Sequence, residues 1–138
     1  MTVAPLESKK IQLASKMENI AEVENLINII FEDHDLSVDY YGNMLVALTE
    51  AVNNAIVHGN KGDESKLIDL EFKHKGDEYF FTIRDGGKGF DFEHVPDPTS
   101  PENIEKPDGR GIFLMQHLAD RVSFSDEGRE VELVFKAY

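Results

Sequence analysis

The chain has 138 residues, 41% of them hydrophobic, and 27 acidic against 14 basic side chains give it a formal net charge of −13. This length predicts a single domain over residues 1–138, with enough apolar residues to bury a core. The charge argues against wide contact with nucleic acid or with an anionic membrane, because Lys and Arg supply most of such affinity. Cysteine is absent, which excludes disulfides, thiolate zinc sites and cysteine nucleophiles.

The sequence gives no sign of a targeting or membrane segment. Its first residues lack the apolar stretch of a signal peptide, and its longest apolar run is Met44–Leu48. A membrane-spanning helix needs roughly 20 apolar residues. We therefore expect a cytoplasmic protein.

Hydrophobic spacing and turn residues predict the secondary structure. In chain order they indicate a strand at about 10–14, two tandem helices at 17–33 and 38–59, and a hairpin of strands at 68–72 and 79–83. A short helix from 109 and two further strands at 122–125 and 131–136 follow. Strands grouped in hairpins, without a repeating βαβ unit, are typical of an α+β fold. We expect a two-layer sandwich whose mixed, mostly antiparallel sheet is covered by helices on one face.

The segment Asp91–Asp108 differs sharply from the rest of the chain. It holds four of the five prolines and six acidic residues against one lysine, and it lacks the apolar period of a helix or a strand. Such a stretch inside a compact domain is either functional, for example a lid, or a disordered acidic insertion. Composition alone leaves both interpretations open.

The second predicted helix carries a polar stripe. Glu50, Asn54 and His58 recur every four residues and so lie along one side of the helix, opposite its aliphatic side. Carboxylate and amide oxygens suit Mg²⁺, which takes few protein ligands and adds water and phosphate oxygens. A solvated helix face gives the same pattern. His58 has no second histidine at ligand spacing, so we assign it to the helix end and not to a metal site.

Two glycine-rich motifs follow. Asp85-Gly86-Gly87-Lys88-Gly89 comes directly after a predicted strand, where its glycines let a ligand approach and Asp85 can accept a hydrogen bond from an amino group. Asp108-Gly109-Arg110-Gly111 opens a helix whose free N–H groups can bind phosphate. A hairpin turn and an N-capping aspartate explain the two motifs equally well without a ligand. Neither motif is a Walker loop or lies in a βαβ unit.

Together and in this order, the three motifs resemble the N, G1 and G2 boxes of the ATPase superfamily shared by gyrase, histidine kinases and mismatch-repair ATPases, whose α+β sandwich is the Bergerat fold. The likeness extends from about Lys10 to Phe135. It implies that residues 91–108 form the ATP lid. Within the superfamily, the short chain with two leading helices is most similar to the anti-sigma-factor serine/threonine kinases of bacterial partner-switching systems.

The resemblance implies a role for each residue of the polar stripe that matches the N box. Asn54 would coordinate the Mg²⁺ that bridges the ATP phosphates. Glu50 would orient or deprotonate the acceptor hydroxyl as a general base.

It also implies roles for the glycine motifs. Asp85 would accept the adenine amino group, and Gly87 and Gly89 would let the loop pass beneath the nucleotide. Backbone amides at Gly109–Gly111 would meet the phosphates, where Arg110 could add charge.

The function implied by the resemblance is that of an Mg·ATP-dependent protein serine/threonine kinase that acts as an anti-sigma factor or partner-switching regulator. Its substrate would be a STAS-type anti-sigma factor antagonist, its second partner a sigma factor, and its assembly a homodimer. The alternative is a nucleotide-binding interaction module that sequesters a partner with little or no kinase activity. One departure bears on activity, because Glu130 stands where many relatives have a Thr or Ser near the start of the last strand.

Overall fold

The computed structural model describes residues 7–87 and 107–137. Its strands and α-helices follow the predicted order: β1 (Glu7–Ala14), α1 (Ile20–His34), α2 (Tyr41–Asn54), β2 (Leu67–Lys75), β3 (Glu78–Arg84), α3 (Pro107–Leu118), β4 (Arg121–Ser125) and β5 (Glu130–Lys136). The predicted α+β sandwich is therefore confirmed. Residues 88–106, with Gly89 and most of the predicted lid, lie outside the described residues.

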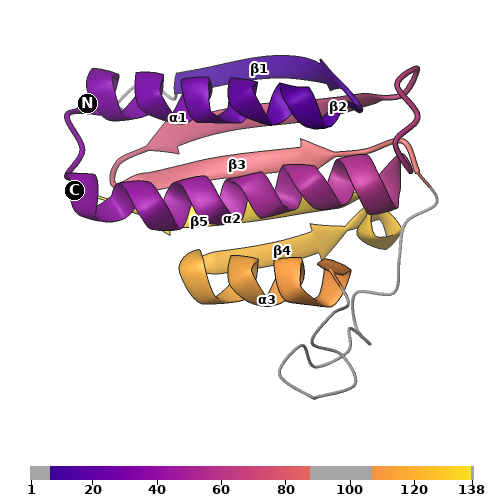
Figure 1. Ribbon diagram of the computed structural model, residues 1–138. Helices are drawn as coiled ribbons and strands as arrows, with labels where there is room; N and C mark the ends of the chain where they lie inside the picture. The colour runs from indigo at the N-terminus through magenta and orange to yellow at the C-terminus, as the bar shows by residue number, and fades with distance from the viewer. Residues whose placement is uncertain (1–6, 88–106, 138) are drawn as a thin grey trace.

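The strands form one sheet in the order β1-β2-β3-β5-β4. Every neighbouring pair is antiparallel, so the described sheet is antiparallel throughout and not mixed as expected. The reason is the position of β5, which returns from β4 and inserts between β3 and β4. These two strands run in the same direction but do not pair (Figure 1).

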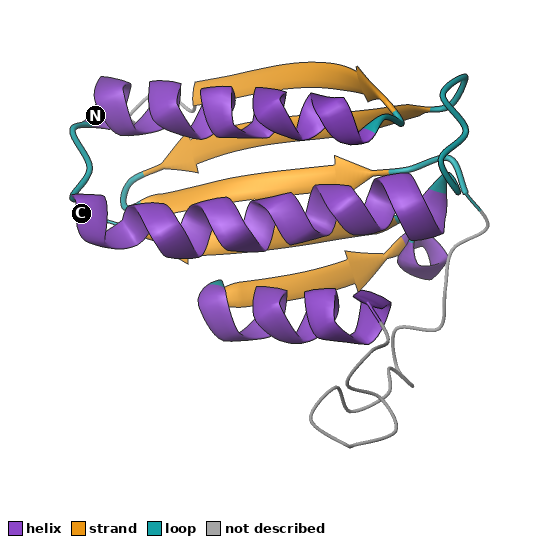
Figure 2. Ribbon diagram, viewed as in Figure 1, coloured by secondary structure: helices purple, strands orange, loops and turns teal. Residues whose placement is uncertain are grey.

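All three α-helices lie on one face of the sheet (Figures 1 and 2). α1 covers β1 and β2, α2 crosses the centre, and α3 lies over β4. Their inward side chains are apolar and almost fully buried, with Val23, Ile27 and Ile30 from α1 and Met44, Leu48 and Val52 from α2. They pack on inward residues of the sheet that include Phe72, Phe81 and Leu133. This burial supplies the main stabilisation of the sandwich.

The C-terminal end of α2 departs from a regular helix. Residues Ala55–Gly59 form one turn of π-helix, and the N–H of Asn60 donates to the Ala55 carbonyl at 2.8 Å. The sequence predicts a helix as far as Gly59 but not this wider turn. Single π turns within helices are frequent at functional sites, and here the turn continues the polar stripe of α2.

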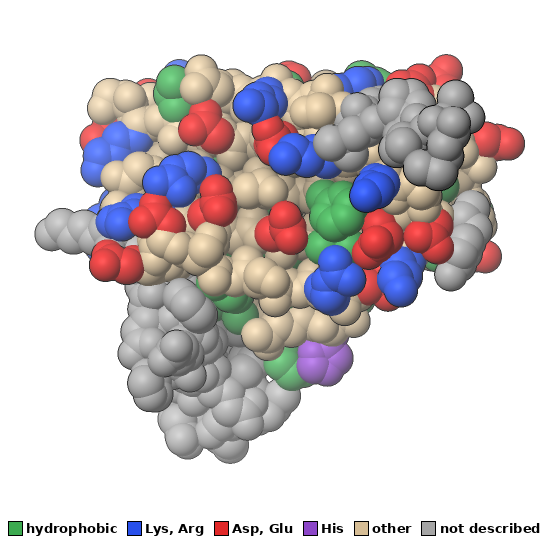
Figure 3. Space-filling model, turned by 180° about the vertical axis from the view of Figure 1, so that it is seen from behind, with side chains coloured by type: hydrophobic (Ala, Val, Ile, Leu, Met, Phe, Trp, Pro, Cys, Tyr) green, Lys and Arg blue, Asp and Glu red, His purple; other side chains and the backbone are tan. Residues whose placement is uncertain are grey.

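The opposite face of the sheet carries interspersed charges (Figure 3). The register places Lys10 opposite Glu71, and their side chains lie 3.2 Å apart. Lys73 lies 3.1 Å from the same glutamate. Exposed pairs of this kind each contribute little to stability, so this face is the polar side of a half-buried antiparallel sheet. No helix within residues 7–87 or 107–137 has the length and apolarity to cross a membrane.

Candidate functional site

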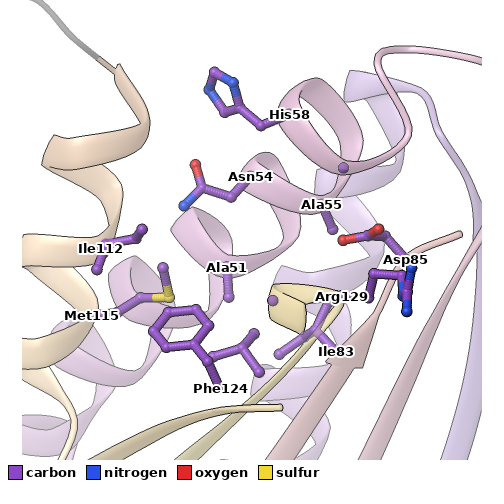
Figure 4. Close-up of a pocket in the computed structure, with 13 residues that line it drawn as sticks. Ala51, Asn54, Ala55, His58, Ile83, Asp85, Ile112, Met115, Phe124 and Arg129 are labelled. Carbon is purple, nitrogen blue, oxygen red and sulfur yellow. The ribbon is translucent and has the colours of Figure 1, made fainter. Parts of the chain in front are cut away.

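At one edge of the sandwich α2 and β3 end and α3 begins (Figure 1). A pocket lies there between these elements (Figure 4). Its lining is mostly apolar with a few polar groups, and consists of Ala51, Asn54, Ala55, His58, Gly59, Ile83, Asp85, Ile112, Met115, Phe124, Gly128, Arg129 and Val131. Apolar walls with a small number of polar groups are typical of sites for small ligands. The pocket thus brings together predicted residues from two of the three motifs.

The third motif meets the polar stripe of α2 beside this pocket. A Cβ atom added to Gly111 would lie 3.0 Å from Oε2 of Glu50 and 3.1 Å from Nδ2 of Asn54. Glycine therefore lets the first turns of α3 approach α2 closely. α3 begins at Pro107, two residues earlier than predicted, as suits a residue without an N–H at the first helical position. The side chain of Arg110 lies outside the described part of the chain, so its role stays a prediction.

The side chain of Asn54 has the chemistry of a metal ligand. Its Oδ1 atom is buried and accepts no hydrogen bond from the described residues. A buried amide oxygen in this state is costly, and it is a ligand type that Mg²⁺ accepts. The residues present therefore fit Mg²⁺. His58 Nε2 is also buried without such a partner, but the described residues contain no group of three or more His, Asp or Glu that could hold a metal.

Asp85 lies immediately after β3, and Figure 4 shows it and Asn54 on either side of Ala55. Its backbone N–H donates to the Arg129 carbonyl at 2.9 Å, and its Oδ1 accepts the Gly87 N–H at 2.8 Å. Burial raises the pKa of the Asp85 carboxyl, and the opposing effects of the Gly87 hydrogen bond and the Arg129 charge do not cancel this shift. The fold therefore holds a partly desolvated carboxylate at the mouth of an apolar pocket.

We expect Asp85→Asn to raise the melting temperature at neutral pH. Because the pKa of Asp85 is raised in the folded state, its ionised form opposes folding above that pKa, and this penalty fades as the pH falls toward the unfolded value. Asparagine keeps the shape and an acceptor for Gly87 without the charge. Thermal unfolding across pH should show a gain that shrinks on acidification, and a gain that grows on acidification would contradict the assignment.

The loop after β3 packs directly on the π turn. A Cβ atom added to Gly87 would overlap the carbonyl oxygen of Gly59, and one added to Gly59 would overlap the carboxylate of Asp85. A Cβ atom on Gly86, in contrast, would lie 3.7 Å from its nearest neighbour, Asn60 Oδ1. Gly87 is thus required by close packing, whereas Gly86 is not.

This contrast gives a matched pair of variants. Gly87→Ala is expected to lower the free energy of unfolding by about 1–3 kcal/mol, the usual cost of forcing an extra carbon into a packed site. Gly86→Ala should change it by less than about 0.5 kcal/mol. Urea unfolding of both variants measures the difference, and equal losses would contradict the steric explanation.

The turn between β4 and β5 places Arg129, and not Glu130, in the lining of the pocket. Arg129 lines the pocket, whereas Glu130 accepts a hydrogen bond from Ser125 Oγ at 2.9 Å and lies 3.7 Å from Nη1 of Arg84. Glu130 is therefore not among the residues that line the pocket. The cause is strand alternation, because Glu130 pairs with Arg84 on the open face of the sheet while Val131 points inward.

Sequence reasoning missed one buried polar residue beside the pocket and three apolar residues that line it. Asn60 is buried, with 1% of its surface exposed. The sequence feature that could have pointed to it is its position directly after the glycine that ends the predicted helix. Ile112, Met115 and Phe124 line the pocket, but their spacing matched that of ordinary core residues. Periodicity shows that a side chain points inward and does not distinguish a pocket wall from the core.

Comparisons with known proteins show the family to which the chain belongs. The model of the histidine kinase-like ATPase domain family matches residues 13–135. An anti-sigma F factor of Clostridium perfringens is 26% identical over 132 residues, which cover 92% of this chain and 93% of that protein. The anti-sigma F factor of Anoxybacillus flavithermus is 33% identical over 107 residues, 72% of each chain.

A further relative is named as a kinase. The serine-protein kinase RsbW of Staphylococcus epidermidis is 27% identical over 133 residues, 91% of this chain and 84% of that protein. The matched range includes the polar stripe and both glycine motifs. The chain therefore belongs to the histidine kinase-like ATPase domain family.

Proposed function

We propose that this chain is an Mg·ATP-dependent protein serine/threonine kinase that regulates a partner-switching system. The observation that carries the proposal is the meeting of Glu50, Asn54 and Gly111 beside the pocket. Family membership implies ATP binding. The names of the relatives, anti-sigma F factor and serine-protein kinase, support a sigma factor as one partner and a protein substrate as the other.

The apolar part of the pocket would hold the adenine. Ile83, Ile112 and Met115 contribute its walls, and burying a flat base among them is favourable because it removes apolar surface from water. Asp85 would then accept a hydrogen bond from the adenine amino group. Gly87, which has no side chain, would let the loop leave room for the adenine base. Gly89 belongs to the same loop motif and lies outside the described residues.

The phosphates would lie at the start of α3. Backbone N–H groups in the first turn of a helix are unpaired, and the helix dipole favours anions there. Because α3 begins at Pro107, its unpaired N–H groups end at Gly109, and Gly111 lies in the next turn at the contact with α2. Asn54 would hold Mg²⁺ through Oδ1. When bound, Mg²⁺ supplies positive charge that offsets the negative charge of the transferring phosphoryl group.

Glu50 would act on the protein substrate. The hydroxyl oxygen of a serine or threonine would attack the γ-phosphorus in line with the bond to the β–γ bridging oxygen, which breaks as ADP leaves. The proton of the hydroxyl would pass to the carboxylate of Glu50. One helical turn separates Glu50 from Asn54 on the same side of α2, which places the base beside the metal ligand.

The substrate proposed is a STAS-type anti-sigma factor antagonist. The test incubates the purified chain with Mg·ATP labelled on the γ-phosphate and a candidate STAS protein, with the same STAS protein lacking its acceptor hydroxyl as control. Phosphate transfer to the intact partner alone supports the proposal. Nucleotide-dependent binding without transfer would overturn the kinase assignment and favour a module that only sequesters its partner.

Two further proposals concern organisation. Residues 1–138 would form one ATPase domain with its ATP lid at about 91–108, and two copies would associate as a homodimer. Limited proteolysis with and without Mg·ATP tests the lid, because a bound nucleotide should protect it from cleavage.

Light scattering at several concentrations tests the dimer, and a constant monomer mass would contradict it.

A further inference from the structure

Asn60 is the centre of a buried polar network next to the pocket. Its Oδ1 accepts the Gly86 N–H at 2.8 Å, and its Nδ2 donates to Ser15 Oγ at 2.8 Å and to the Leu67 carbonyl at 3.2 Å. Ser15 continues the network by donating to the Lys66 carbonyl at 2.7 Å. Asn60 and Ser15 are 1% and 2% exposed, so water does not compete for these hydrogen bonds.

The network joins three segments that are far apart in the sequence. Ser15 follows β1, Leu67 begins β2, and Gly86 lies in the loop after β3. The hydrogen bonds to Ser15 and Leu67 connect Asn60 to the end of β1 and the start of β2. The hydrogen bond from Gly86 fixes the backbone of the loop after β3. A fully satisfied buried network favours one arrangement, because any displacement leaves a polar group unpaired.

The fixed loop is the one that carries Asp85. Gly86 lies between Asp85, whose carboxylate faces the pocket, and Gly87, which rests on the Gly59 carbonyl. Gly87 also donates its N–H to the Asp85 carboxylate. The carboxylate is therefore held by its own loop, while the loop is held in turn by Asn60 and by the π turn. Supporting contacts of this kind keep a binding group in its productive geometry.

We propose that Asn60 is a positioning residue for base recognition, which holds the Asp85–Gly87 loop so that the site selects a purine with a 6-amino group. This proposal rests on the proposed nucleotide-binding function of the pocket. A 6-amino group donates to the carboxylate, whereas a 6-oxo group would place oxygen lone pairs against it. Sites built to hydrogen-bond one group reject an analogue that lacks it, since the polar atom of the protein is then left unpaired.

The test compares binding of Mg·ATP and Mg·inosine triphosphate, which has a 6-oxo group, to the full chain by calorimetry. The wild-type chain should prefer ATP by at least about tenfold, and Asn60→Ala should reduce this preference to below about threefold. Ile30→Val is the control, because Ile30 is buried in α1 and is not among the residues that line the pocket. It should lower the melting temperature and keep the preference.

The outcomes separate this proposal from the function on which it rests. If the wild-type chain prefers ATP and Asn60→Ala prefers it equally, the role of Asn60 is overturned and the nucleotide site stands. If the wild-type chain binds both nucleotides equally, base recognition by Asp85 and the role of Asn60 fail while the nucleotide site stands. If it binds neither, the proposed nucleotide-binding function itself fails. Loss of the preference in Ile30→Val as well would also overturn the role, since stability alone would then explain the effect.

A second measurement covers the case in which Asn60→Ala does not fold. Hydrogen exchange of the wild-type chain without nucleotide reports on the Gly86 amide directly. We expect this amide to be protected to a similar degree as the amides at the end of β3, because Asn60 accepts its hydrogen bond. Exchange at the rate of an unstructured peptide would overturn the proposal.

Discussion

Replacing Glu50 by glutamine is expected to slow phosphate transfer by about 100-fold or more, as is usual when a general base is removed. Glutamine has nearly the same size and shape, so the close approach between α2 and α3 at Gly111 should survive. Its amide cannot accept the proton of the substrate hydroxyl. The affinity for ATP should stay within about threefold of wild type, because the role proposed for Glu50 concerns the acceptor hydroxyl and not the nucleotide.

Single-turnover transfer to a STAS substrate measures the first effect, and calorimetry with Mg·ATP measures the second. Glu24→Gln is the matched control, since Glu24 is exposed on α1 and the change removes the same charge. It should transfer phosphate at the wild-type rate. A Glu50→Gln variant that transfers normally would show that another group takes the proton, whereas a large loss of ATP affinity would place Glu50 in nucleotide binding.

Removing Mg²⁺ is expected to weaken ATP binding by about tenfold or more, because few other cations are available to the phosphates. The chain has a formal charge of −13, and six acidic residues against one lysine occupy the proposed lid. Under the proposed function, the site would obtain its positive charge from backbone amides, from Mg²⁺ held by Asn54 and from Lys106 or Arg110. Calorimetry in Mg²⁺ and in EDTA tests this, and equal affinities would contradict it.

Asn54→Ala should abolish most of that Mg²⁺ dependence. It should also raise the melting temperature without nucleotide, because it removes a buried oxygen that accepts no hydrogen bond from the described residues and adds a better helix former. Asn53→Ala is the control, as Asn53 precedes it on α2 and is absent from the described pocket lining. Asn53→Ala should retain the Mg²⁺ dependence. A fall in melting temperature for Asn54→Ala would contradict the role assigned to its oxygen.

The two variants Asn54→Ala and Asp85→Asn share a physical basis. Each removes a polar group that the fold keeps in an unfavourable state, one without a partner in the described residues and the other partly desolvated. Sites for ligands commonly lower stability in this way, because their groups are arranged for the ligand and not for the empty fold. A gain in stability together with a loss of ATP binding would identify both as site residues.

The order of the elements follows from the amino-acid sequence, which also predicts the three motifs of the candidate site. The helices and strands have apolar residues at their own periods, and Gly76 closes the hairpin between β2 and β3. These signals are local, since they depend on neighbouring residues and on turn chemistry. The polar stripe and the glycine motifs were recognisable for the same reason, because each lies within a few consecutive residues.

How these pieces meet depends on the tertiary structure. It inserted β5 between β3 and β4, turned Arg129 instead of Glu130 toward the pocket, and placed Asn60 between Ser15 and Gly86. Each result depends on residues far apart in the chain. Periodicity says which side of an element faces inward, but packing and strand pairing over the whole fold determine which partner it finds there.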